Sequence, residues 1–236
     1  MKHPSRYNLL TPGTHNPKTA KAAGVGNYAN VILHLAPDNV AGVGSVCPWA
    51  GACAKGCLNT AGRGAMSTVQ RARIRRTRLL REDPETFHAL LYDDLFRFAT
   101  RAFDQGFEPV ARLNGTSDLP IWRWPAFQHW RNDITFYDYT KRDYDLWPDI
   151  DGYHRTYSYD PMNGWDKAAT ALDNGANVAV VFDTPKNDPL PDSWRGYRVI
   201  DGRTHDYRFL DPAGVIVGLS ALGKARHDYT FTQKAG

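Results

Sequence analysis

The chain has 236 residues, of which 42% are hydrophobic and 23% charged, and its formal net charge is +4. This composition is typical of one globular α/β domain that buries a full core. No apolar run reaches the length of a membrane span, and the first residues lack the apolar core of a signal peptide. We therefore expect a cytoplasmic protein without a membrane partner. The weak positive charge allows an anionic partner without requiring one.

The amino-terminal part differs in composition from the rest. Residues 1–29 are rich in Pro, Gly, Asn and Lys, which predicts an extended arm, and we expect a single catalytic domain over residues 30–236. The first predicted strand, Asn30–Pro37, leads into a loop at residues 45–64. That loop contains all the cysteines of the chain, Cys47, Cys53 and Cys57.

Three cysteines in one short loop indicate a metal site. A disulfide would leave one thiol over, whereas three thiolates can hold an iron–sulfur cluster or a zinc ion. A cluster held by three thiolates keeps one coordination position open. Zinc with His34 or His205 as a fourth ligand remains an alternative, and so do buried cysteines with no ligand role.

Beyond the loop, apolar periodicity predicts alternating helices and strands. A helix over 66–81 precedes a second over 85–105, with Asp83 as the cap of the second and Pro84 in its first turn. Later strands are predicted at 109–114, 134–139, 154–159, 177–182, 198–200 and 214–219, and short helices at 124–131, 142–147 and 165–174.

This alternation predicts parallel β/α units in a single barrel-like domain, a partial or irregular TIM-type barrel. In such a barrel the carboxyl ends of the strands meet at one mouth, where catalytic groups lie. Polar residues follow most of the predicted strands, among them Asn114, Ser117, Asp118, Asp138, Lys141, Ser158 and Asp160. We therefore expect thiols and carboxylates to meet at that mouth. For Asp160, which precedes a proline, capping of a turn is the favoured interpretation.

The first predicted helix is strongly basic, with six arginines and no acid between residues 71 and 81. Helical periodicity separates an inward apolar set, Ile74 with Leu79 or Leu80, from an outer set, Arg71, Arg75 and Arg78. The outer face would track phosphates in a nucleic-acid-binding protein. A solvated helix whose arginines pair with acids elsewhere explains the same pattern.

Four stretches, Cys57–Gly64, Arg112–Asp118, Phe136–Lys141 and Arg208–Leu219, together resemble the gene product 88 family of mycobacteriophages and related elements. The similarity extends from about Leu10 to Lys224. It implies a phage protein that acts in the host cytoplasm. The family has no settled activity, so the chemistry must come from the residues.

A looser resemblance is to radical S-adenosylmethionine enzymes, in which a three-cysteine loop after the first strand of a partial barrel holds a 4Fe-4S cluster. The order of strand, cysteine loop and helix is similar here, with different cysteine spacing. Gly115–Asp118 is similar in place to their motif that contacts the amino group of the cofactor. This resemblance implies that Asn114, Gly115 and Ser117 bind S-adenosylmethionine, with Asp118 beside them. Arg63, ahead of the basic helix, would hold a phosphate or carboxylate.

The stretch Phe136–Arg142 is also weakly similar to the nucleophile strand of barrel enzymes that exchange guanine for a 7-deazaguanine base in nucleic acid. That resemblance implies Asp138 as nucleophile and Asp118 as its partner, with structural zinc on the cysteines.

The leading hypothesis is thus a phage-type iron–sulfur enzyme that modifies a nucleotide or nucleic acid with S-adenosylmethionine. In it, Cys47, Cys53 and Cys57 bind the cluster, and Asp118, Asp138 and Lys141 serve the reaction. The alternatives are the transglycosylase-like enzyme with zinc and a metal-stapled nucleic-acid-binding module without catalysis.

Overall fold

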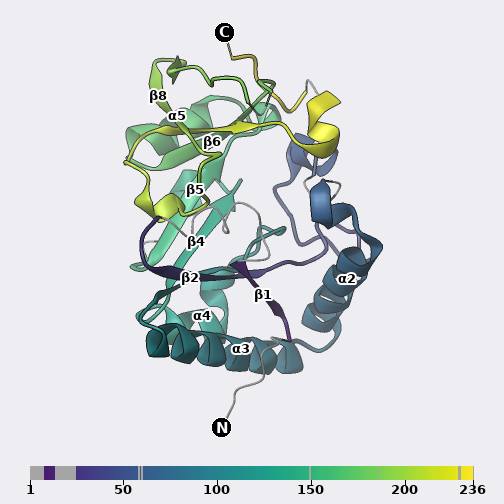
Figure 1. The fold of residues 1–236 in the computed structure, drawn as a ribbon. Helices are drawn as coiled ribbons and strands as arrows, with labels where there is room; N and C mark the ends of the chain where they lie inside the picture. Colours follow the sequence, from purple (N-terminus) through teal and green to yellow (C-terminus); the bar gives the residue numbers. More distant parts are fainter. Residues whose placement is uncertain are drawn as a thin grey trace.

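The computed structural model describes residues 8–13, 25–57, 59, 61–148, 150–185, 187–227 and 230–235, and these form one open mixed sheet with helices on one face (Figure 1). Its nine strands are β1 (Leu10–Pro12), β2 (Tyr28–Leu33), β3 (Glu108–Arg112), β4 (Thr135–Thr140), β5 (Tyr153–Ser158), β6 (Asn177–Phe182), β7 (Ser193–Trp194), β8 (Tyr197–Asp201) and β9 (Ile216–Ser220).

The strand order is β1-β2-β3-β4-β5-β6-β9-β8-β7. Strands β2 to β6 lie side by side in chain order and all run parallel, as in successive β/α units. After β6 the order reverses, because β9 inserts between β6 and β8. The short strands β1 and β7 pair antiparallel at the two edges. The expected TIM-type barrel is therefore not formed; the sheet stays open.

One face of the sheet is covered by helices α3 (Pro84–Asp104) and α4 (Pro125–Trp130), with α2 (Ser67–Glu82) alongside (Figure 1). Helix α3 begins where the sequence predicts: the Asp83 carboxylate accepts a hydrogen bond from Thr86 N at 3.1 Å, and Pro84 is in the first turn. Its inward stripe recurs at helical spacing and packs on β2 to β5, namely Phe87, Leu91, Leu95 and Phe98.

The other half of the sheet has a smaller core on the same face. Helix α5 (Asp166–Asp173) packs Ala168, Ala171 and Leu172 against β5, β6 and β9. Because all the crossovers that carry these helices join neighbouring parallel strands in the same sense, α3, α4 and α5 gather on one side. This one-sided cover leaves the opposite face to be filled by loops.

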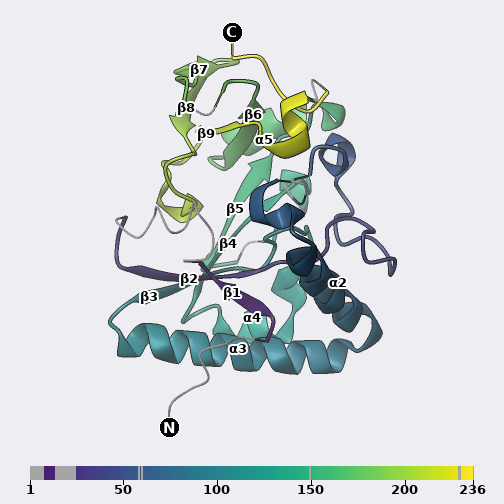
Figure 2. The same cartoon turned by 45° about the vertical axis from the view of Figure 1, so that its right-hand side comes forward.

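That opposite face is covered by the connection between β8 and β9. Tyr207 and Phe209 of this connection pack on Tyr28, Val110 and Tyr137. The Tyr28 and Phe209 rings meet edge to face, with centroids 5.1 Å apart. Figure 2 shows the connection lying across the strands on the side away from α3.

The predicted arm over residues 1–29 lies partly outside the described residues. Within it, residues 10–12 form β1, which sequence reading missed because three residues show no periodicity. The buried Asp94 carboxylate of α3 holds this strand, accepting from Leu9 N at 2.7 Å and Leu10 N at 3.1 Å. A strand this short is thus ordered by tertiary contacts.

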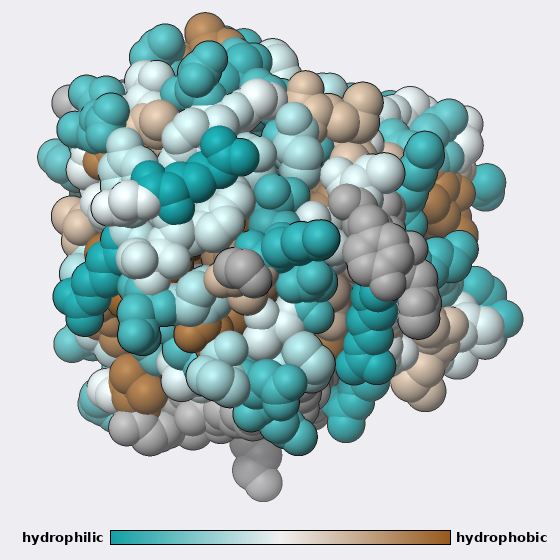
Figure 3. All heavy atoms as spheres, turned by 90° about the horizontal axis from the view of Figure 1, so that it is seen from above, coloured by the Kyte–Doolittle hydropathy of each residue, from teal (hydrophilic) through white to brown (hydrophobic). Residues whose placement is uncertain are grey.

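Most other predicted elements are present, with ends shifted by a few residues. The strand predicted at 30–37 is β2, which ends at Leu33, and the helix predicted at 66–81 is α2. The helical turn predicted at 142–147 is the 3-10 turn η7 (Tyr144–Leu146). The face seen in Figure 3 is mostly hydrophilic, with scattered apolar patches. None of the helices in the described part of the chain is both long and apolar enough to cross a bilayer.

Candidate active site

The cysteine loop lies across the carboxyl ends of the sheet and touches the segments that follow four strands. Asp118 N, after β3, donates to Val46 O at 2.9 Å. The loop then forms the 3-10 turn η3 (Gly51–Ala54), whose Ala52 packs on Ala221 and Ala225 beyond β9. One loop thus brings all three cysteines to the edge where parallel strands end.

Cys47 lies at the first corner of the loop, beside the segment after β3. Its Sγ is 3.7 Å from Thr116 O, and it accepts a hydrogen bond from Asp38 N at 3.3 Å. Burial raises the pKa of this thiol to about 12, and the nearby thiols of Cys57 and Cys53 raise it as well; the Asp38 N–H acts in the opposite direction.

Cys53, in η3, lies against the segments that follow β4 and β5. Its N–H donates to the Asp160 carboxylate at 3.2 Å. Burial raises the pKa of the Cys53 thiol, and the ammonium group of Lys141 lowers it. Gly51 is needed at this contact, because a Cβ there would lie 2.6 Å from Asp160 Oδ2 and its φ is +51°.

Cys57 lies near the end of the loop, next to α2. Its Sγ accepts a hydrogen bond from Asn59 N at 3.5 Å. Burial raises the pKa of the Cys57 thiol, while the Asn59 N–H and the guanidinium of Arg73 lower it. Each of the three thiols therefore has a neighbouring donor or cation that favours its thiolate form, but burial has the larger effect and raises the pKa of all three.

Helix α2 clamps both ends of this loop through its inward face. Gln70 Nε2 donates to Asn59 O at 3.0 Å, and Arg73 Nη1 donates to Asn59 Oδ1. At the other end, Ala36 N donates to Thr77 Oγ1 at 2.8 Å. Arg73 and Thr77 are buried, although the sequence pattern suggests only apolar inward residues. The side chains that hold the thiol loop are therefore polar.

The three cysteines, all within the described residues, are not joined by a disulfide. Across the residues that the structure describes, no three His, Cys, Asp or Glu side chains converge closely enough to hold a metal ion. The donor set is nevertheless of the type that soft metals and clusters prefer, since the three thiols are close enough for Cys53 and Cys57 to raise the pKa of Cys47. Metal binding to such a set would draw the sulfurs together.

The segment after β3 is organised around Asn114. Its Oδ1 accepts from Ser117 Oγ at 2.8 Å and from Leu119 N at 2.9 Å, and its Nδ2 donates to Leu119 O. Gly115 allows close approach to β2, because a Cβ there would lie 2.7 Å from Leu33 O. Asn114, Gly115 and Ser117 therefore shape this segment, and the side-chain polar atoms of Asn114 are used within it.

Asp118 and Lys141 lie at the same edge, in reach of the thiols. The Asp118 carboxylate accepts from Thr140 Oγ1 and from Lys141 N, both at 2.8 Å. Burial raises the pKa of Asp118, and these hydrogen bonds lower it. Asp118 is also close enough to raise the pKa of both Cys47 and Cys53. The carboxylate predicted beside the cysteines is thus placed beside two of them.

The Lys141 side chain is buried under the cysteine loop. Its Nζ donates to Ser158 O at 3.1 Å and lies 3.7 Å from the Asp160 carboxylate. Asp160 also accepts from Met162 N at 3.1 Å and so caps the turn after β5, as its sequence context predicts. Lys141 thereby puts one positive charge between the thiols and the end of β5.

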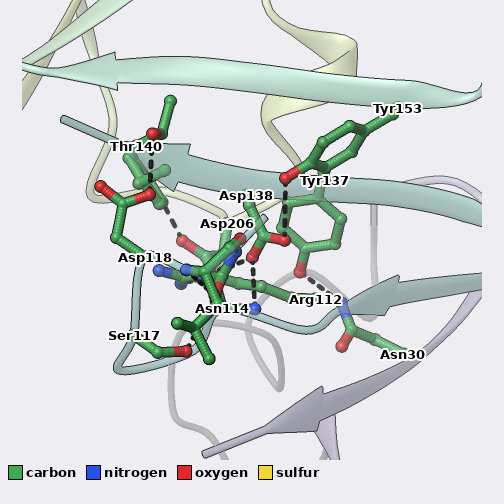
Figure 4. Close-up of polar contacts among 12 residues, drawn as sticks. Asn30, Arg112, Asn114, Ser117, Asp118, Tyr137, Asp138, Thr140, Tyr153 and Asp206 are labelled. Carbon is green, nitrogen blue, oxygen red and sulfur yellow. Dashed lines mark hydrogen bonds and ion pairs between the residues drawn. The ribbon is translucent and has the colours of Figure 1, made fainter. Parts of the chain in front are cut away.

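Asp138, the other predicted catalytic carboxylate, lies deeper, where β3 and β4 separate. Its Oδ1 accepts from Asn114 N at 2.8 Å and is 3.8 Å from Arg112 Nε (Figure 4). It has no exposed surface, and burial raises its pKa to about 8, against the effect of Arg112. A buried carboxyl that is protonated at neutral pH suits a strand bridge better than the nucleophile expected from the transglycosylase resemblance.

Arg112 joins this bridge to the opposite face of the sheet. Its Nη1 donates to the buried Asp206 carboxylate at 3.0 Å, and its guanidinium stacks 4.6 Å over the Tyr139 ring. Tyr139 OH in turn donates to Asp206 at 3.4 Å. In Figure 4, Arg112 lies between Asp206 and Asp138 in one cluster of polar side chains. The cluster anchors the β8–β9 connection to the sheet.

Comparison with known protein families matches residues 8–235 to the family described as Gene product 88. The chain belongs to the gene product 88 family. No curated protein and no solved structure matches it. The family description names no activity for this chain.

Three of the four stretches that resemble gene product 88 proteins border the carboxyl edge. Cys57–Gly64, apart from positions 58 and 60, which lie outside the described residues, leads from the third thiol to α2. Arg112–Asp118 and Phe136–Lys141 supply the carboxylates and the lysine. The fourth, Arg208–Leu219, covers the opposite face and forms β9. The family resemblance thus gathers around the thiol loop and the cluster beneath it.

The remaining predicted residues lie around the same edge. Arg63 is exposed in the 3-10 turn η5 (Gly62–Ala65), directly before α2. Burial lowers the pKa of His34 to about 3, and Arg73, Arg112 and Arg76 lower it further, so its ring is neutral. His205 lies beside Arg208 on the opposite face, with 3.2 Å between Nδ1 and Nη2.

Sequence reasoning missed Arg73 and Thr77, and it grouped Asp206 with the polar residues that follow strands without predicting its pairing with Arg112. The sequence contains a signal for Arg73 and Thr77. Arg73, Thr77 and Leu80 are separated by four and three residues, which places them on one face of a helix. Hydrophobic periodicity discounts such a face because two of its members are polar. For Asp206, nothing in the surrounding sequence indicates burial.

Proposed function

We propose that this gene product 88 protein is an enzyme in which Cys47, Cys53 and Cys57 hold a 4Fe-4S cluster, with S-adenosylmethionine at the open iron and a nucleotide or nucleic acid as substrate. One observation supports this most: each thiol has its own thiolate-stabilising neighbour, and all three lie along the carboxyl edge of parallel strands. Catalytic groups of β/α folds lie at that edge.

When bound, the cluster would supply single-electron chemistry. Residues of the chain would balance its charge, exclude water and bind the cofactor. Lys141 and Arg73 place positive charge beside Cys53 and Cys57 and so offset the charge of the thiolates. The apolar group of Ala52, Ala221, Ala225 and Phe231 lies behind η3 and keeps water from that side. Asp118, held by Thr140, is the carboxylate best placed to accept a hydrogen bond from a bound amino group.

Purification without oxygen, followed by elemental analysis, tests the proposal. We expect iron and sulfide with visible charge-transfer absorbance, both lost in Cys57→Ala. Met66→Ala, which removes an exposed sulfur beside the loop, is the control and should keep both. Zinc without iron would overturn the cluster and favour a zinc site. No metal, with Cys57→Ala identical to the wild type, would overturn any metal role.

A further inference from the structure

Basic residues are concentrated in one continuous part of the chain. Residues 39–81, which comprise the cysteine loop and most of α2, contain eight Lys or Arg residues and no Asp or Glu. The rest of the chain has more acidic than basic residues. The net charge of +4 is therefore distributed unevenly, and the cysteine loop and helix α2 form a strongly basic region.

Part of this charge forms an exposed stripe on α2. Arg71, Arg75 and Arg78 are exposed, whereas Arg73 and Thr77 of the opposite side are buried. Spacings of four and three residues put the exposed arginines on one face. The expectation that they lie outward is confirmed.

The described residues offer these three arginines no acidic partner, since none of the ion pairs formed within 4.0 Å involves them. Within the described residues, the other interpretation of the sequence, a solvated helix balanced by nearby acids, therefore lacks acidic partners for these three arginines. The stripe is available to an anionic partner.

The stripe also borders the thiol loop. Arg78 Nε donates to Ala41 O at 3.3 Å, and Arg81 Nη2 donates to Ser45 O at 2.7 Å, two residues before Cys47. The loop thus runs along α2 before it turns to the strand ends. A chain of phosphates on the stripe would lie next to the segment that carries the first thiol.

We propose that Arg71, Arg75 and Arg78 bind the phosphodiester backbone of a single nucleic-acid strand and lead one of its nucleotides to the thiol site. The stripe is about 10 Å long at about 1.5 Å per residue, which is longer than a single phosphate group. A polymer fits better than a free nucleotide, because separated guanidiniums need successive phosphates. An unpaired strand presents its bases without the cost of extrusion from a duplex. The proposal deepens the proposed function by naming its substrate class.

Strand binding can be measured on the full chain without adding metal. Fluorescence anisotropy with a labelled single-stranded oligonucleotide, over a series of NaCl concentrations, gives the slope of log affinity against log salt. For Arg71→Gln/Arg75→Gln we expect weaker binding and a slope reduced by about 0.7 to 0.9 for each lost phosphate contact. The matched control is Arg131→Gln/Arg198→Gln, which removes the same charge near the amino ends of β4 and β8 and should bind like the wild type.

The outcomes separate this proposal from its competitors. Equal loss in both double variants would overturn it, since net charge alone would then explain binding. So would equal or tighter binding to the matched duplex, or equally strong, arginine-dependent binding to phosphatidylserine vesicles. The measurement needs no metal. Absent iron would therefore count against the proposed cluster, and unchanged strand binding in Arg71→Gln/Arg75→Gln would count against this surface.

Discussion

The cysteine loop and the cluster around Arg112 both contain polar groups, but the partners of those groups differ. In the Arg112 cluster, a buried cation meets two buried carboxyl groups, and Asp206 and Asp138 both bond to it or to backbone N–H groups. In the loop, three half-buried thiols lie close enough for Cys53 and Cys57 to raise the pKa of Cys47, and each has a donor or cation beside it. The first arrangement pairs a cation with carboxyl groups, whereas the second gathers sulfur atoms, which are soft donors.

This difference shows that polar residues at strand ends do not share one role. Asp138 and Asp118 look alike in sequence, each at the end of a strand next to a threonine-containing segment. Asp138 bridges two strands and burial raises its pKa to about 8, whereas Asp118 lies beside two thiols. Complete burial with fixed partners is typical of a structural group, and the carboxylate near the thiols is the better functional candidate.

The largest expected effect comes from breaking the complete cluster. Arg112→Met leaves the buried carboxylate of Asp206 without its cation, and we expect a loss of about 3–5 kcal/mol in the free energy of unfolding. Urea unfolding measures it, with the exposed Arg198→Met on β8 as control. A loss as small as the control's would show that the cluster does not anchor the β8–β9 connection.

A smaller effect is expected where α2 clamps the loop. Arg73→Met removes both the hydrogen bond to Asn59 and the positive charge beside Cys57. Residues that support metal ligands typically change affinity by about 10- to 100-fold, and we expect metal content at limiting iron to fall accordingly. Arg75→Met, on the exposed side of the same helix, should retain its metal. Equal retention in both variants would remove Arg73 from the site.

The carboxyl of Asp138 predicts a dependence of stability on pH. Its folded pKa of about 8 lies above that of the unfolded chain, so the folded state binds the extra proton. Stability is then fully present below the unfolded pKa, near 4, and is lost as pH rises toward 8, by at most about 1.4 kcal/mol per pH unit.

Asp138→Asn should remove this slope while keeping the acceptor for Asn114 N. Urea unfolding from pH 4 to 8 should show the wild type losing stability relative to the variant. Parallel curves for the two proteins would mean that Asp138 is ionised in the folded state. Its assignment as a neutral bridge would then fail, and a nucleophilic role would return.

The smallest effect concerns the other end of the loop. Thr77→Val leaves Ala36 N without its acceptor in a buried place, and we expect a loss of about 1–3 kcal/mol. Thr170→Val is the control, because that exposed hydroxyl bonds only to Asp166 O of its own helix. If thermal unfolding shows equal shifts for both, Thr77 does not fasten the loop.

Local patterns in the sequence predict most of the helices and strands, but they do not predict which strands pair. Helix α3 follows from its cap at Asp83 and an apolar residue at each inward position, and both are local signals. The reversal of strand order after β6 has no such signal, because β9 pairs with a strand more than thirty residues earlier in the chain. Periodicity says which face of a strand is buried and nothing about which strand lies beside it.

By itself, the sequence determined the helices, the run of parallel strands and the grouping of thiols in one loop, because each depends on residues that are close along the chain. Only the tertiary structure decided which polar groups are buried beside a partner of opposite charge and which are not. The Cys53 N–H and the Asp160 carboxylate that accepts from it are 107 residues apart. Burial and charge at such a contact come from the packing of distant segments, and these set the chemistry of a side chain.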